Sequence, residues 1–456
     1  MEMDTMTLEA KRKKALALLK QKKAKKAQDH GVDYKTYTYD MFMNSMGQAP
    51  AEIKRFSQWV NQASADGIYA FESARTSMQT TEVDLVRETG EAMHLLNFSS
   101  YNYLGFGYHP EVIKAAQDAV AQFGLGANSS PVISGTYMIH RQLENALVKF
   151  FGMPDTGVSL FSSGYAVNLG VIQAYIKPGN YVVCDRAAHM SILEGAKISG
   201  GKVEYFEHND LDSLRVVLEK INDGFSRILV CIEGVYSGEG DYGKVKEIVK
   251  LAKKHQAAVL IDEAHSVLVA GEHGRGVAEE QGVLEDIDFY VMTFSKAMSG
   301  VGGAVLAKKD MIRYINWYAK CRMFSCALDP AVTGGMVKVL ELVSSDEGYK
   351  RRARLHKNAD YLRACLEPYV DIGASTSWIV TAIFHDEKQT LALNDYLQRE
   401  GLDTSIMQFP AVPKNEARIR MFVTSEHTRE QIEEAARIIR RAAETFHFLK
   451  EGAPSE

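Results

Sequence analysis

Residues 258–266 read AVLIDEAHS, and residues 288–300 read DFYVMTFSKAMSG. Each stretch begins with a short apolar run rich in β-branched or aromatic residues, which is typical of a buried strand. Residues 244–255, KVKEIVKLAKKH, precede the first run and have the spacing of an amphipathic helix. This alternation of strand and helix predicts an α/β fold with a mainly parallel central sheet.

The same pattern extends along the chain in both directions. A stretch with helical spacing begins at Pro110, where a helix accepts proline, and runs to Phe123. Its stripe of apolar side chains includes Val112 and Val120. Further buried strands are predicted at residues 157–161, 181–184, 228–232 and 302–306.

Past Asp329 the pattern changes to long helices, then to short strands at residues 379–384 and 418–423 and a final helix at 426–446. This change predicts a smaller C-terminal α+β domain. We expect an N-terminal extension with a linker at residues 1–50 and an N-terminal segment at 51–105. A large cofactor-binding domain should follow at 106–328, then a small domain at 329–447 and a tail at 448–456.

Composition narrows the class of protein. The chain has 456 residues and a net charge of −5, and no apolar run approaches the roughly 18 to 20 residues that cross a bilayer. Its beginning, MEMDTMTLEA, lacks the apolar core of a secretory signal, so we expect a cytoplasmic protein. The five cysteines are scattered without metal-ligand spacing, so we expect neither a disulfide nor a metal site.

Residues 11–26, KRKKALALLKQKKAKK, form a strongly basic stretch. The stretch fits a solvated tail, and it also fits an amphipathic helix. As a helix or a tail it would attract an acyl carrier protein, the phosphates of coenzyme A or an anionic membrane surface. The sequence does not choose among these partners, and nothing in it indicates nucleic-acid binding.

Polar side chains follow the two opening runs at the edge of the sheet where ligands bind. Lys296 has the hydroxyls of Thr293 and Ser295 beside it. An amine here suits a Schiff base with a carbonyl cofactor, and the hydroxyls suit a phosphate. Asp262 ends the other run, and a protonated pyridine nitrogen is a partner that would justify a buried carboxylate. His265 lies within reach of the same ring.

A third strand end supplies a phosphate site. Ser163, Gly164 and Tyr165 follow the strand at 157–161 and begin a helix, where backbone N–H groups bind phosphate and glycine permits close approach. His189, beyond the strand at 181–184, is placed to stack on a ring. Each residue alone has a plainer interpretation, as a surface lysine, a capping aspartate or a core histidine. Together they predict pyridoxal 5'-phosphate (PLP).

The motifs of this chain resemble those of the α-oxoamine synthases, which are fold-type I PLP-dependent transferases. The matching motifs, in order, are NYLG at 102–105, GTxxxHxxLE at 135–144, SGYAVN at 163–168, DRAAHMS at 185–191, EGVYSGEGD at 233–241, DEAHS at 262–266, GRG at 274–276 and TFSK at 293–296. GIYAFES at 67–73 and FPAVPKNEARIRMFVTSEHT at 409–428 are most similar to bacterial serine palmitoyltransferases. The resemblance covers about residues 53–446.

The resemblance implies a role for each matching residue. Lys296 would bind the cofactor aldehyde, Asp262 the ring nitrogen and His265 the ring hydroxyl, and His189 would stack on the ring; these four form the expected catalytic set. Residues expected to hold the phosphate or lie beside the cofactor are Ser163, Gly164, Tyr165, Ser237, Thr293, Ser295 and, from the neighbouring subunit of a homodimer, Ser325. Asn102 and Arg420 would bind substrate, with a bidentate guanidinium suited to a carboxylate.

The activity that the resemblance implies is decarboxylative condensation of an amino acid with an acyl thioester, giving an α-amino ketone. Serine and a long-chain acyl-CoA or acyl carrier protein are favoured. Alanine or glycine, as in 8-amino-7-oxononanoate synthase or glycine C-acetyltransferase, is the alternative. A catalytically inactive partner subunit, a transaminase or lyase, and a Ser-His-Asp hydrolase fit the residues less well, since the lysine is present and no G-x-S-x-G elbow is evident.

The chain departs from the family pattern at two places. Gln408 stands near a position where bacterial serine palmitoyltransferases often have arginine, which puts carboxylate binding in doubt. Ser266, Val267 and Leu268 replace the usual Ser-x-Gly. The sequence therefore suggests a differently shaped loop there and, with it, a different acyl pocket.

Overall fold

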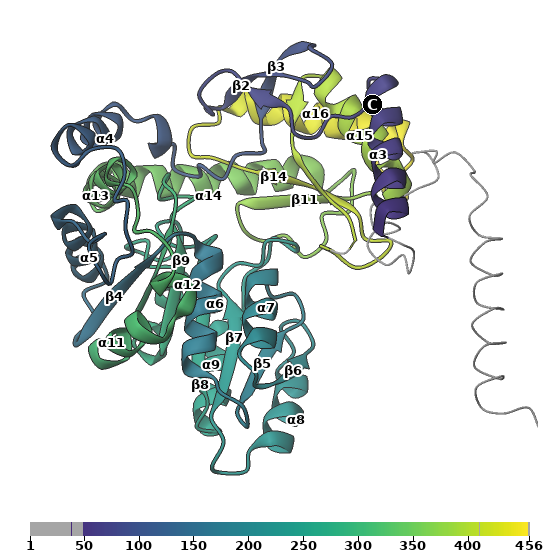
Figure 1. The fold of residues 1–456 in the computed structure, drawn as a ribbon. Coiled ribbons are helices and arrows are strands. Elements are labelled where there is room, and N and C mark those ends of the chain that lie inside the picture. The colour runs from purple at the N-terminus through teal and green to yellow at the C-terminus, as the bar shows by residue number, and fades with distance from the viewer. Residues whose placement is uncertain (1–37, 39–48, 410, 455–456) are drawn as a thin grey trace, which may run out of the picture. The chain divides into compact units, whose positions relative to one another are not determined.

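The computed structural model describes residue 38, residues 49–409 and residues 411–454. The basic stretch at 11–26 and most of the predicted linker lie outside these residues. The chain forms two compact units that divide between Tyr69 and Ala70. Within the first unit, residues Ala49–Ala65 form the helix α3 (Figure 1).

The second unit is built on a seven-stranded sheet with the strand order β4-β10-β9-β8-β7-β5-β6. All pairings from β9 to β6 are parallel, and only β10 runs antiparallel to its neighbours β4 and β9. The predicted mainly parallel sheet is thus confirmed. The strands are β4 (Thr156–Phe161), β5 (Tyr181–Asp185), β6 (Lys202–Phe206), β7 (Ile228–Glu233), β8 (Ala258–Asp262), β9 (Phe289–Thr293) and β10 (Gly303–Lys308).

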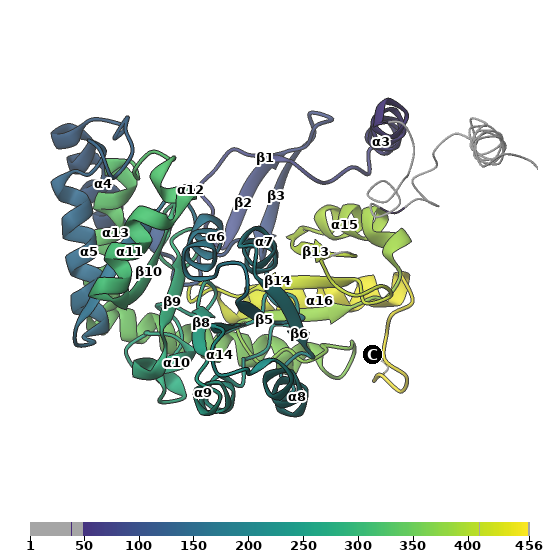
Figure 2. The same ribbon diagram turned by 60° about the horizontal axis from the view of Figure 1, so that its bottom comes forward.

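Helices cover both faces of this sheet. Cys184, Leu260 and Val291 point to the face that carries α6 (Gly164–Tyr175), α7 (Met190–Ile198) and α11 (Lys309–Tyr318). Val183 and Ile261 point to the other face, which carries α8 (Leu211–Ile221) and α9 (Val245–Lys254) (Figure 2). Because both faces are covered, the strands read as continuous apolar runs rather than alternating ones.

Two smaller sheets complete this unit. One has the order β1-β2-β3-β12 and joins strands from near residue 80 to a strand past residue 400, and the other has the order β11-β14-β13. Their strands are β1 (Ala74–Arg75), β2 (Glu82–Val86), β3 (Ala92–Asn97), β11 (Ile379–Ile383), β12 (Leu402–Asp403), β13 (Ser405–Met407) and β14 (Arg418–Phe422). The expected strands at 379–384 and 418–423 are therefore present.

The remaining helices frame these sheets. The long helices expected past Asp329 are α13 (Pro330–Val343) and α14 (Asp346–Leu366), and the final helix is α16 (Arg429–Thr445). The others are α4 (Pro110–Phe123), α5 (Met138–Phe151), α10 (Val277–Glu280), α12 (Lys320–Met323) and α15 (Thr390–Arg399), with 3-10 turns at Phe106–Tyr108, Leu284–Asp286 and Glu387–Gln389. The domain boundaries expected within this unit stay predictions.

The apolar stripe expected on α4 is only partly right. Val112 is buried, but Val120 is 37% exposed and Ala119 is buried in its place. The reason is α13, whose Gly334 approaches α4 so closely that a Cβ there would lie 2.6 Å from that of Ala119. Close helix contact favours the small side chain over the branched one.

In the part of the chain that the structure describes, no helix combines the length and the apolar character needed to span a bilayer. The cytoplasmic location stays a prediction.

Candidate active site

The carboxyl ends of the parallel strands meet at one edge of the large sheet and line a cavity of about 1060 Å³. Asp262 ends β8, Thr293 ends β9 and Glu233 ends β7. Register explains the grouping, since Asp262 pairs with Val291 on one side and with Glu233 on the other. Residues that the sequence analysis placed at the ends of different strands thus lie in one site.

Lys296 lies just past β9 and is half-buried between two cavities. The second cavity has a volume of about 720 Å³ and shares Tyr101, Ser295 and Lys296 with the first. The amine lies 5.7 Å from the centre of the Tyr101 ring. Burial among the cavity walls lowers the pKa of Lys296 to about 8, against the opposing pull of Asp262 and Glu233. A lowered pKa keeps part of this amine uncharged and nucleophilic near neutrality.

Asp262 is buried, and its carboxylate borders the large cavity. One oxygen accepts a bond from Nδ2 of Asn168 (2.6 Å) and the other from the backbone N–H of Ala264 (2.9 Å). The Oδ1 atom of Asn168 has no hydrogen-bond partner among the described residues. Asp262 is thus fixed in place, with a cationic partner expected from the cavity side.

The two histidines border the same cavity in uncharged form. His265 is buried, its Nδ1 lies 2.7 Å from the hydroxyl oxygen of Tyr103, and burial lowers its pKa well below the usual value. His189 begins α7, and its surroundings also lower its pKa, chiefly by desolvation. The ring of His189 makes an edge contact with that of Tyr165, at 6.0 Å between centroids.

The expected phosphate site combines a helix terminus with two hydroxyl groups. Ser163 caps α6 by accepting a bond from the Ala166 N–H (3.1 Å), and Gly164 is the first helical residue. A Cβ on Gly164 would lie 2.6 Å from that of Thr293, so only glycine leaves this approach open. The hydroxyls of Thr293 and Ser295 lie 2.9 Å apart across from it. Helix terminus and hydroxyls together suit a phosphate group.

The expected substrate residues lie in different cavities. Arg420, on β14, reaches into the large cavity and donates bonds to the Ser237 carbonyl and the Ser405 hydroxyl (3.0 Å each). Its Nε has no hydrogen-bond partner among the described residues. Asn102 lines the second cavity instead, where its Oδ1 accepts a bond from the Ser299 hydroxyl (3.0 Å).

One predicted site residue lies apart from the others within this chain. Ser325 borders neither of the cavities at Lys296, and its hydroxyl lies 3.5 Å from that of Ser162 beside a separate small pocket. This position does not conflict with the expectation that Ser325 acts in a neighbouring subunit, which stays a prediction.

The two departures from the family pattern have different consequences. At the first, Met407 and Phe409 line the large cavity, whereas Gln408 does not. At the second, Leu268 has a φ of +68° and is fully buried, so the backbone holds the left-handed conformation that glycine favours. Neither Val267 nor Leu268 lines either cavity at Lys296, so the expected effect on an acyl pocket there finds no support.

Two residues of the site had no predicted role. Glu233 is a buried carboxyl whose Oε1 accepts a bond from the His189 N–H (2.5 Å), and burial raises its pKa well above the usual range, with Asp262 adding to the effect. Tyr101 stands between Lys296 and Phe422. The sequence did contain a signal for Glu233, because this acidic residue directly follows a predicted buried strand. No feature of the neighbouring sequence indicated that Tyr101 belongs to the site.

These features fit PLP. An amine of lowered pKa, a fixed carboxylate and a glycine-opened helix terminus border one cavity, and they match the aldehyde, the ring nitrogen and the phosphate of that cofactor. The orphaned atoms of Asn168 and Arg420 mark places where the site expects a polar ligand.

Comparisons with known proteins agree with this assignment. Residues 93–439 match the family model for aminotransferase class I and II. An 8-amino-7-oxononanoate synthase of Thermoanaerobacter pseudethanolicus is 34% identical over 79% of this chain and 90% of its own length. A serine palmitoyltransferase of Sphingobacterium spiritivorum is 34% identical over 86% of this chain and 96% of its own.

Solved structures give the same result. A serine palmitoyltransferase from S. paucimobilis with bound PLP and myriocin superimposes with a TM-score of 0.82 at 30% identity, covering 88% of this chain and all of the other. The chain therefore belongs to the aminotransferase class I and II family. Within it, the chain is a fold-type I, PLP-dependent acyltransferase of the α-oxoamine synthase type.

Proposed function

We propose that this enzyme condenses serine with a long-chain acyl thioester, releases carbon dioxide and the thiol, and yields an α-amino ketone. The observation that carries the proposal is the meeting of Lys296 and Asp262 at one cavity, at the ends of adjacent strands. The serine palmitoyltransferase names of similar proteins support serine. The product would be the starting compound of sphingolipid biosynthesis.

In this proposal each part of PLP has its own residues. Lys296 would bind the aldehyde, Asp262 the ring nitrogen and His265 the ring oxygen, and His189 would lie against the ring. Bound PLP supplies an electron sink for the charge left when a bond to Cα of the amino acid breaks. The residues that would hold the phosphate are Ser163, Gly164, Tyr165, Thr293 and Ser295, and Ser237 would lie beside the cofactor.

The residues of the chain perform the proton transfers and the positioning. The Lys296 amine would remove the Cα proton of the amino acid as a general base, for which its lowered pKa suits it. Arg420 holds the amino acid carboxylate until carbon dioxide leaves. His189 donates a hydrogen bond to the oxygen that becomes negative when the thioester carbonyl is attacked.

The acyl chain has an apolar path in the large cavity. Met190 and Leu193 from α7 and Met407, Phe409 and Val412 from the C-terminal region line the cavity beyond His189. Apolar walls favour a fatty acyl group over a short polar one. The second cavity is lined by polar groups such as Arg75, Asn102 and Asp403, which suits the amide arm of the thiol carrier.

We also propose that the enzyme is a homodimer with shared sites. Leu125, Ile133, Met138 and Phe324 are large apolar side chains between 65% and 82% exposed. The loops around them meet, since the Ser130 hydroxyl bonds the Met323 carbonyl (2.7 Å). An apolar patch of this kind marks a protein interface, and it lies beside Ser325, which would then reach a partner's phosphate site.

The alternative substrate is alanine, as in 8-amino-7-oxononanoate synthase, because relatives with that name are as similar in sequence as the serine palmitoyltransferases. The test is a screen of serine, alanine and glycine for spectral change of the PLP-loaded enzyme. Products with CoA and carrier-protein donors are then identified by mass spectrometry. We expect serine and a long-chain donor to give the largest response, and turnover of alanine alone would contradict the proposal.

A further inference from the structure

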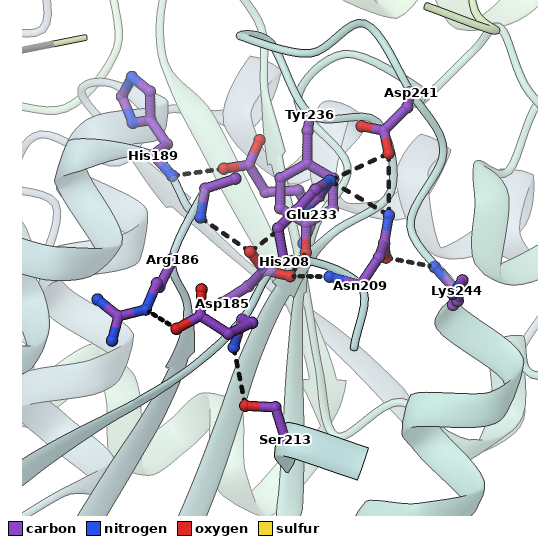
Figure 3. A network of polar contacts seen from close by, with 12 residues as sticks. Asp185, Arg186, His189, His208, Asn209, Ser213, Glu233, Tyr236, Asp241 and Lys244 are labelled. Atoms are coloured by element: carbon purple, nitrogen blue, oxygen red, sulfur yellow. Dashed lines mark hydrogen bonds and ion pairs between the residues drawn. The ribbon is translucent and has the colours of Figure 1, made fainter. Parts of the chain in front are cut away.

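A polar network borders the large cavity near His189, with His208 at its centre (Figure 3). Its Nδ1 lies 3.0 Å from Oδ1 of Asp185, and its Nε2 lies 3.0 Å from Oδ2 of Asp241. Each ring nitrogen of His208 therefore faces a carboxylate. An imidazole can donate from both nitrogens only as a cation.

The three residues come from three successive strand ends. Asp185 ends β5, His208 follows β6, and Asp241 lies in the loop after β7. Asp185 is fully buried and accepts further bonds from the N–H groups of Ala187 (2.8 Å) and Asn209 (3.1 Å). A single side chain thus joins the turns that leave three neighbouring strands.

The surroundings of His208 decide its charge. Besides Asp185 and Asp241, two groups face it. The Tyr236 ring makes an edge contact (4.5 Å), and its hydroxyl donates to Asp185 (3.1 Å). The Asn209 amide nitrogen lies 3.3 Å from Nε2 and donates to Asp241 (2.9 Å). Burial by itself lowers the pKa of His208, but the hydrogen bonds to both aspartates outweigh it and raise that pKa to about 10. Its neighbour Glu207 is exposed and paired with Arg186.

Two of the joined turns carry residues of the proposed cofactor site. The turn after Asp185 leads to His189, whose N–H is also held by Glu233 (2.5 Å). The loop that ends at Asp241 contains Ser237, and the Tyr236 N–H closes that loop on the Asp241 carbonyl (3.0 Å). Movement of either aspartate would therefore shift a residue at the cofactor.

We propose that His208 is a positioning residue, a partly buried cation that ties the turns after β5, β6 and β7 and so fixes His189 and Ser237 against the cofactor. The proposal rests on the proposed roles of those two residues. Without the cation, Asp185 and Asp241 keep only neutral donors, and two neighbouring carboxylates without a positive charge between them repel each other and drive rearrangement. The turns would then relax, and the cofactor would be held less well.

The test compares PLP binding by apoprotein of the wild type, H208Q, H208Q/D241N and the control H255Q, whose histidine lies at the far end of α9. We expect H208Q to raise the PLP dissociation constant about tenfold, as loss of outer supports does at metal sites, and to weaken the visible circular dichroism of bound PLP. The double variant, with one carboxylate fewer, should recover part of both losses. Wild-type binding and dichroism in H208Q would overturn the proposal.

A direct measurement covers the case in which H208Q does not fold. Histidine-labelled wild-type protein is titrated by NMR, with D241N identifying the His208 signal by its shift. We expect His208 to remain charged well above neutral pH, and a neutral ring at neutral pH would overturn the proposal. If wild-type apoprotein does not bind PLP at all, the proposed function fails, whereas normal wild-type binding with an unaffected H208Q removes only the role of His208.

Discussion

At the scale of single residues, Lys296 and Glu233 show how the cavity sets charge. Both lie at the carboxyl edge of the sheet, and both are shifted toward their uncharged forms by burial. The effect makes the lysine a better nucleophile and keeps the glutamate from competing with Asp262 for a cation.

The lowered pKa of Lys296 predicts how fast apoprotein captures PLP. Only the uncharged amine attacks the aldehyde, so the rate should rise with pH up to about 8 and level off above it. Stopped-flow absorbance at a series of pH values measures this rate. A profile that keeps rising to the usual lysine pKa, near 10.5, would contradict the account of the site.

The raised pKa of Glu233 predicts that its neutral analogue is tolerated. Glu233→Gln should change the free energy of unfolding by less than about 1 kcal/mol, whereas Glu233→Ala leaves the His189 N–H unpaired and should cost about 1–3 kcal/mol. Asp262→Asn, by contrast, should weaken PLP binding, because a charge is needed there. Thermal unfolding gives the stability of the three variants, and titration with PLP gives their affinity for the cofactor. An equal loss of PLP affinity in Glu233→Gln and Asp262→Asn would contradict the different roles given to these two carboxyl groups.

At the scale of elements, the beginning of α6 depends on a missing side chain. Gly164→Ala places a Cβ 2.6 Å from that of Thr293, so the helix must move away from β9. We expect PLP affinity to fall at least tenfold, because the phosphate contacts lie on both sides of this gap.

A matched control for this change is Gly335→Ala in α13, where the added Cβ would find no atom closer than 3.5 Å. Isothermal titration of each apoprotein with PLP gives the affinities. Unchanged binding in the Gly164 variant would show that the phosphate does not lie at this helix terminus.

Much of the site was predictable at this scale, because strand ends in a parallel sheet converge whatever their separation in sequence. Asp262 and Lys296 were each recognisable as residues at or just past the end of an apolar run, and the pairing of β8 with β9 brings both to one cavity. The position of Ala119 in place of Val120 was not predictable, since it depends on a glycine of α13 about two hundred residues later. Edge strand β6, half-buried and mixed in composition, gave no clear signal either.

The backbone conformation of Leu268 was also not predictable from the sequence, because it goes against the preference of leucine. Leu268 stands in a left-handed conformation that costs a non-glycine residue roughly 1–2 kcal/mol. Its fully buried side chain offsets that cost. The structure thus holds Leu268 in a conformation that glycine favours, with its side chain packed in the core.

At the scale of the whole molecule, the proposed homodimer is tested through Phe324, which is 82% exposed beside Ser325. Phe324→Asp should convert dimer to monomer in sedimentation analysis and should weaken PLP binding, because each phosphate site would lose a contact from the partner subunit. Phe225→Asp is the control, since Phe225 is 96% exposed on a different loop. A wild-type protein that is monomeric and fully active would contradict the proposal of shared sites.

The central claim is that one lysine, Lys296, holds PLP covalently opposite Asp262. Borohydride reduction of PLP-loaded protein fixes that bond, and peptide mass spectrometry then locates the added group. The account predicts a single phosphopyridoxyl adduct, on the peptide that contains Lys296. An adduct on another lysine, or none at Lys296, would contradict it.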